Sequence, residues 1–209
     1  MPNRWVVVLG AVLLQICIGA IYAWSLFNKP LMDTFCWSNS ETVMTFSIIV
    51  FVFAFITLFS GRLQDRIGPK IVATIGGIMY GLGLILSSTA TTTTQLYFYY
   101  GVISGIGVGF VYVCPLTTCI KWFPDKKGFI TGIAVGAFGL GSLVFKAIIE
   151  YLLEVTGVSE TFFYLGVLFM VMTVLGAQFL SVPKNISLSV VATKAQNDFT
   201  MVEMMKTKT

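Results

Sequence analysis

The side chains of this chain that could do chemistry suit binding rather than catalysis. Its 209 residues include no histidine, and its Asp and Glu residues lie at or beyond the ends of long apolar runs. The four cysteines show no paired spacing, which argues against a disulfide framework or a metal site. No nucleophile lies beside a base. We therefore expect no enzyme, no cofactor and no bound metal.

Polar groups inside the apolar runs are the candidates for binding. Gln15 and Tyr22 lie in the first run, and Tyr112 lies in the fourth. Polar side chains are costly in lipid and tend to face an interior or a cavity. We expect these three residues to line a cavity. Two alternatives stay open, because Gln15 could join two helices by a hydrogen bond and a tyrosine could belong to an aromatic belt at the membrane surface. We expect such a belt to contain Trp5, Trp24, Trp122, Tyr97, Tyr99 and Tyr100.

The elements that position these groups are predicted to be membrane-spanning helices. The chain is 56% hydrophobic and 11% charged, with a mean hydropathy of +0.89, whereas soluble domains carry about 25% charged residues. About 20 apolar residues cross a bilayer as a helix. Six runs qualify and predict an all-α bundle over residues 1–182: 5–27, 43–60, 71–88, 96–120, 129–149 and 162–182. We expect Pro115 to kink the fourth helix, and residues 183–209 to form a polar cytoplasmic linker.

The distribution of cations predicts the orientation in the cell membrane. With the N-terminus inside, eleven Lys and Arg residues fall on the inner side and two, Lys29 and Lys146, on the outer side. Cytoplasmic loops carry such an excess, so both termini are expected in the cytoplasm. Because the cations lie at the ends of apolar runs, we expect a bilayer and not a nucleic acid as the partner. Lys146 is expected at the outer interface, paired with Glu150.

The densest charge cluster is "GRLQDRIGPK", residues 61–70, which we expect to be the turn between the second and third helices. Retention of the loop inside the cell accounts for its cations but not for Asp65, Gly61 or Gly68. The pattern resembles the signature loop of the major facilitator superfamily. The resemblance implies a cytoplasmic gate that contains Asp65 and Arg66. The residues of this loop that match the pattern and are candidates for the gate are Gly61, Asp65, Arg66, Gly68 and Lys70. Gly61 would allow close helix packing, and Gly68 an unusual backbone angle.

Three further stretches, residues 19–31, 121–141 and 198–207, are similar to the oxalate:formate antiporter family, whose members and relatives move small carboxylates. The resemblance implies the N-terminal half of a major facilitator fold, built from two inverted three-helix repeats. A weak alignment of residues 19–26 with 109–116 fits that repeat. The resemblance to the antiporter family also implies that Tyr22 contacts the substrate. Phe138, the fourth candidate for the cavity lining, lies where the oxalate-specific pattern has a tyrosine, which favours a less polar monocarboxylate.

Members of that family have twelve helices, so we expect a second six-helix half as a partner, in another chain or in a missing C-terminal part. Exchange is favoured over proton coupling, since no Asp, Glu or His lies at the middle of a run. The alternative is a truncated or non-transporting membrane protein, such as a scaffold or a remnant. Glycines at four-residue spacing, Gly101, Gly105 and Gly109, predict close helix packing, as do those at 132, 136, 139 and 141.

Overall fold

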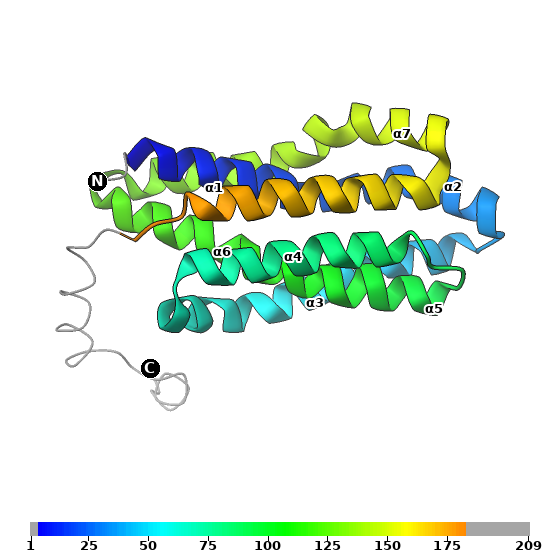
Figure 1. The fold of residues 1–209 in the computed structure, drawn as a ribbon, viewed down its shortest axis with the longest axis horizontal. Helices are drawn as coiled ribbons and strands as arrows, with labels where there is room; N and C mark the ends of the chain where they lie inside the picture. Colours follow the sequence, from blue (N-terminus) through cyan, green and yellow to red (C-terminus); the bar gives the residue numbers. More distant parts are fainter. Residues whose placement is uncertain (1–3, 183–209) are drawn as a thin grey trace, which may run out of the picture.

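Helices make up nearly all of residues 4–182, which is the part of the chain that the computed structural model describes, and no strand occurs within this part. The elements are α1 (Arg4–Gly19), η1 (Ala20–Trp24), α2 (Ser25–Phe35), α3 (Asn39–Ile67), α4 (Pro69–Ser87), α5 (Thr93–Leu96), η2 (Tyr97–Ser104), α6 (Gly105–Trp122), η3 (Pro124–Lys126) and α7 (Lys127–Gln178). They lie side by side in one elongated bundle (Figure 1). The predicted linker lies outside the described residues.

Five helical stretches are long and apolar enough to cross a membrane: Arg4–Phe35, Asn39–Ile67, Pro69–Ser87, Thr93–Trp122 and Pro124–Gln178. The last is longer than one crossing needs, because 52 residues of α7 would extend about 78 Å as a straight helix. Within α7 the backbone leaves the helical region at Gly157, where φ is 78° and ψ is 180°. Figure 1 shows α7 doubling back as two antiparallel arms, 127–156 and 158–178.

Two of the predicted loops are shorter than expected. Residues 150–161 were expected to connect two helices, yet only Gly157 among them departs from helical geometry. Residues 61–67 were expected to lie in a turn and instead form the last two turns of α3. Neither segment contains a proline, and helix-forming residues such as Leu, Arg and Gln continue the helix until a glycine ends it. The expected unusual backbone angle at Gly68 is confirmed, with φ of 93° and ψ of 148°.

The fourth predicted span is irregular at a different place from the one expected. α6 continues through Pro115 with helical backbone geometry. The departure from α-helical hydrogen bonding lies instead in η2, a π-type segment from Tyr97 to Ser104. π-helical turns are rare in proteins, and those that occur frequently lie at functional sites. The expected turn after the first span also begins late, because α2 continues to Phe35 and ends at Cys36, a left-handed residue with φ of 57°.

Glycines set how α3 packs against α6. A Cβ added at Gly101, Gly105 or Gly109 would lie only 2.7 to 3.0 Å from the side chains of Ile48, Val52 or Ile56, respectively. Real Cβ atoms essentially never come within 3.0 Å, so a side chain at Gly101 or Gly109 would force its neighbour to shift, and Gly105 lies at this limit. Each glycine follows its partner by 53 residues, which is also the separation of the Gln64–Thr117 pair. A constant separation means that the two helices run parallel, and the predicted close packing of this stripe is confirmed.

The second predicted glycine face is confirmed at one position only. A Cβ added at Gly141 of α7 would lie 2.7 Å from the Cα atom of Gly19, so the two backbones cross in contact. At Gly132, Gly136 and Gly139, no described atom lies within 4 Å of an added Cβ. These three point away from the helices that surround Gly141, so the close packing predicted for them is wrong within residues 4–182.

Two of the aromatic residues that were predicted to lie in the belt at the membrane surface, Trp24 and Tyr100, lie in the protein core. Trp24 and Tyr100 are 3% and 4% exposed, and their rings lie 4.5 Å apart. The indole N–H of Trp24 donates to the carbonyl of Thr42 over 3.0 Å, and the rings of Phe27 and Phe162 complete the cluster. An indole with a buried partner needs no contact with a membrane surface. The belt assignment is therefore wrong for these two residues.

Candidate functional site

Three of the four predicted cavity residues meet in one aromatic cluster. The ring of Phe138 in α7 lies 5.3 Å from that of Tyr22 in η1 and 5.0 Å from that of Tyr112 in α6, both edge-on. Phe53 of α3 joins the cluster through Tyr112, at 5.2 Å. We call Tyr22, Tyr112, Phe138 and Phe53 the aromatic cluster. Edge-to-face pairs at such distances stabilise a fixed arrangement of rings.

The crossing of α1 and α7 builds this cluster. A Cβ added at Gly19 would collide with the carbonyl oxygen of Phe138, and one added at Gly141 would collide with that of Ile16. Tyr22 follows Gly19 by about one turn, and Phe138 precedes Gly141 by about one turn. Residues spaced this way lie on the same helix face. The glycine contact therefore fixes the distance between the two aromatic side chains.

The cluster combines a buried ring with an accessible hydroxyl. Phe138 is 7% exposed, Tyr112 is half-buried and Tyr22 is 46% exposed. Tyr22 also borders a cavity of about 240 Å³ whose polar groups come from Ser25, Ser142 and Lys146. Hydroxyl and ammonium groups can donate hydrogen bonds to an anion. The predicted pair of Lys146 with Glu150 is confirmed at 3.7 Å, and both side chains are about half exposed.

Gln15 lies beside the cluster but points into the protein. It is fully buried in α1, and its Nε2 donates to the backbone carbonyl of Tyr112 over 3.4 Å. Of the two interpretations left open by the sequence, the structure shows the hydrogen bond between helices. The other amide atom, Oε1, is buried without a hydrogen-bond partner among the described residues. Gln15 thus holds α1 against α6 at the height of Tyr112.

The charged segment at the end of α3 contacts α6. Asp65 forms an ion pair with Lys121 over 3.3 Å, and Gln64, which is 4% exposed, hydrogen-bonds Thr117 over 2.7 Å. Arg66 and Lys70 are exposed and form no ion pair within residues 4–182. The sequence analysis identified Asp65 but neither of these partners. The sequence could not identify them, because the 53-residue offset that places Gln64 opposite Thr117 comes from the packing of α3 on α6.

Gly61 does not play the packing role expected of it within this chain. No described atom lies within 4 Å of a Cβ added there. The close approach predicted between two helices is therefore wrong for residues 4–182. Gly68 likewise has open space around it, and its positive φ is what favours glycine.

The fold and the sequence define a helical, multi-pass membrane protein. The family model of the Major Facilitator Superfamily matches residues 3–199. The chain belongs to this superfamily. The expected signature resemblance is thereby confirmed at the level of the family.

Individual relatives are transporters. The chain is 34% identical to the uncharacterized MFS-type transporter YhjX of Escherichia coli, over 98% of this chain and 51% of the relative. It is 31% identical to the oxalate:formate antiporter of Oxalobacter formigenes, over 98% of this chain and 49% of the relative. Human monocarboxylate transporter 7 is 28% identical over 76% of this chain and 30% of the relative. The chain spans about half the length, or less, of these curated relatives.

The two contacts between the end of α3 and α6 should differ in their effect on stability. Gln64→Ala removes a partly buried hydrogen bond and should lower the free energy of unfolding by about 1–3 kcal/mol. Asp65→Asn removes an exposed ion pair that water screens, and it should lower the free energy of unfolding by less than about 1 kcal/mol. Denaturant unfolding of the purified chain in detergent measures both. A larger loss for Asp65→Asn than for Gln64→Ala would contradict this ranking.

Proposed function

We propose that this chain is the N-terminal six-helix half of a transporter that moves small organic anions across a membrane by alternating access. The observation that carries the proposal is the aromatic cluster, which places two tyrosines from different helices around Phe138. The printed names of its relatives, an oxalate:formate antiporter and monocarboxylate transporters, support the class of small carboxylates. In superfamilies of this kind, the substrate site lies near the middle of the bilayer, where repeats meet.

In this proposal the two arms of α7 each cross the membrane, which gives six crossings arranged as two inverted three-helix repeats. Arms of 30 and 21 residues would be about 45 Å and 32 Å long. Each is long enough for a hydrocarbon core of about 30 Å. The beginning of α1 and the end of α7 lie at the same end of the bundle in Figure 1, as an even number of crossings requires.

We place this end, which carries Arg4 and the Asp65–Lys121 pair, in the cytoplasm. Cys36 is exposed near the opposite end, whereas Cys17, Cys114 and Cys119 are buried. An impermeant thiol reagent added to intact cells should therefore label the parent chain and not the Cys36→Ser variant. Equal labelling of the two proteins, or labelling of Cys36 only after the cells are opened, would contradict the assigned orientation.

The chemistry of the cluster suits a carboxylate that also has an apolar part. A tyrosine hydroxyl donates to a carboxylate oxygen, and the Phe138 ring offers only apolar surface. A hydroxyl in place of Phe138 would favour a second carboxylate, so we propose a monocarboxylate with a methyl group, such as lactate or pyruvate, rather than oxalate. Lys146 and the serine hydroxyls of the adjoining cavity would attract the anion toward Tyr22.

A second six-helix half would complete the site. The segment with Asp65 and Arg66 would form part of the cytoplasmic gate between the halves. The support is that α3 leaves large apolar side chains uncovered along one face. Phe51, Phe55 and Leu58 are 72%, 53% and 60% exposed. Lipid or a second half could cover such a surface, and transport requires the second.

The proposal predicts that the two tyrosine hydroxyls contribute to substrate binding. A hydrogen bond to a charged group contributes about 1.5–3 kcal/mol. Tyr22→Phe or Tyr112→Phe should therefore raise the apparent substrate constant about tenfold or more. Uptake of labelled lactate, pyruvate, formate and oxalate is measured in cells that make the chain with a matching second half, and cells with the chain alone set the background.

Tyr97→Phe serves as the matched control, since Tyr97 lies in η2 and outside the aromatic cluster. It should change the substrate constant less than twofold, with membrane insertion equal in all variants. If the three variants behave alike, the tyrosines are packing residues and the proposed site is wrong.

A further inference from the structure

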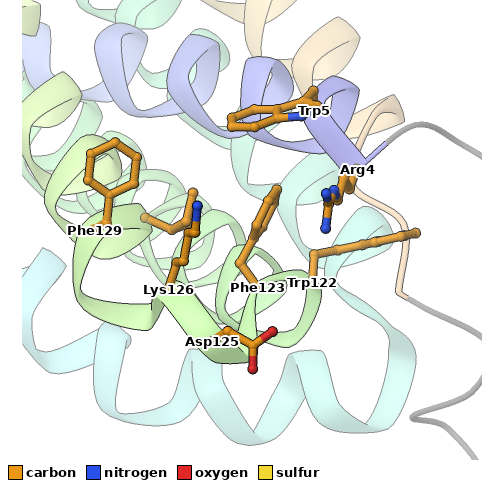
Figure 2. Close-up of a pocket in the computed structure, with 8 residues that line it drawn as sticks. Arg4, Trp5, Trp122, Phe123, Asp125, Lys126 and Phe129 are labelled. Carbon is orange, nitrogen blue, oxygen red and sulfur yellow. The ribbon is translucent and has the colours of Figure 1, made fainter.

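The cation-rich end of the bundle contains a pocket that is separate from the aromatic cluster. It lies between the start of α1 and the segment that joins α6 to α7, and its volume is about 120 Å³. The residues that line it include Arg4, Trp5, Trp122, Phe123, Lys126 and Phe129 (Figure 2). We call it the basic pocket. We propose that it binds the phosphate group of an acidic phospholipid from the adjoining leaflet.

Two cations of the basic pocket, Arg4 and Lys126, have no acidic partner among the described residues. Within residues 4–182, neither Arg4 nor Lys126 forms an ion pair or a side-chain hydrogen bond. The acid that lines the pocket, Asp125, points away from both cations in Figure 2. Among the residues that the structure describes, the lining therefore carries a net positive charge, and its two cations are oriented away from Asp125.

The Arg4 guanidinium is held in a geometry that suits phosphate. It lies 5.4 Å from the centre of the Phe123 ring, and the ring of Trp5 packs on Phe123 at 5.4 Å. A guanidinium fixed over an aromatic face keeps the N–H groups at its edge for a phosphate oxygen. In Figure 2, Arg4 and Lys126 lie on opposite sides of Phe123. Both cations therefore border the pocket, one on each side of the Phe123 ring, and both carry donors that suit an anion.

The size and surroundings of the pocket favour a lipid over a free anion. A volume of about 120 Å³ holds about four water molecules, which suits a headgroup phosphate but not acyl chains. Trp5 and Phe129, which flank it, are 52% and 64% exposed, so their rings can lie against the first carbons of the acyl chains. Tryptophan is enriched at the headgroup level of membranes, and basic pockets between helices bind anionic headgroups.

Titration of the purified 209-residue chain in zwitterionic detergent tests this proposal. The probes are phosphatidylglycerol, phosphatidylcholine with the same acyl chains, and inorganic phosphate, and native mass spectrometry counts the bound lipid. Phosphatidylglycerol should bind about tenfold more tightly than phosphatidylcholine. Arg4→Gln/Lys126→Gln should weaken the binding of phosphatidylglycerol about 25-fold, which is roughly fivefold for each cation. Asp125→Asn should strengthen it about fivefold.

The matched control removes two charges from the same end of the bundle but not from the pocket. Arg62→Gln/Lys127→Gln should leave binding within twofold, because neither residue lines the basic pocket. If Arg4→Gln impairs folding, Lys126→Gln alone should still weaken binding about fivefold. Equal losses in the two double variants, equal binding of the two lipids, or displacement of the lipid by millimolar inorganic phosphate would overturn the proposal.

Discussion

The contact between the backbones of Gly19 and Gly141 is the constraint on which the candidate site depends. Any side chain at either position would collide with a carbonyl of the facing helix. Because the helices meet there, Tyr22 and Phe138 lie one turn away on facing sides, and their rings touch at 5.3 Å. Tyr112 reaches the same ring from α6, and the amide of Gln15 fixes the backbone of Tyr112 to α1. Residues of α1, η1 and α6 thus converge on Phe138 of α7.

A second glycine contact fixes the position of α6. The stripe of Gly101, Gly105 and Gly109 seats this helix on α3 in a parallel arrangement that continues to the Gln64–Thr117 and Asp65–Lys121 pairs. The charged segment at residues 61–67 is therefore part of α3, and it contacts α6, the helix that carries Tyr112. A movement of the charged end of α3 relative to α6 would have to break a partly buried hydrogen bond as well as an exposed ion pair. This coupling links the charged segment to the aromatic cluster through one pair of helices.

The periodicity and composition of the sequence predicted the helical bundle, the unusual backbone angle at Gly68 and the stripe of Gly101, Gly105 and Gly109. Polar side chains inside apolar runs indicated Tyr22 and Tyr112, and the resemblance to the antiporter family indicated Phe138, although the chain separates these residues by up to 116 positions. The sequence could not show that Trp24 and Tyr100 are buried, because an aromatic residue near the end of an apolar run has the same local pattern in a belt and in a core. Gly132 and Gly141 belong to the same series of glycines in the sequence, but only Gly141 contacts a neighbouring helix within the described residues. Only the tertiary arrangement decides which glycine touches a helix.

The central claim is that the Gly19–Gly141 crossing builds the substrate site. The direct measurement is the apparent substrate constant of Gly141→Ala, in cells that also make the second half, with insertion checked by immunoblot. The added methyl group must displace α1 from α7, so we expect the constant to rise about tenfold or more. Gly128→Ala, in the same helix with no described atom within 4 Å of the added Cβ, should transport like the parent. An unchanged constant for Gly141→Ala, or equal effects of the two substitutions, would contradict this account.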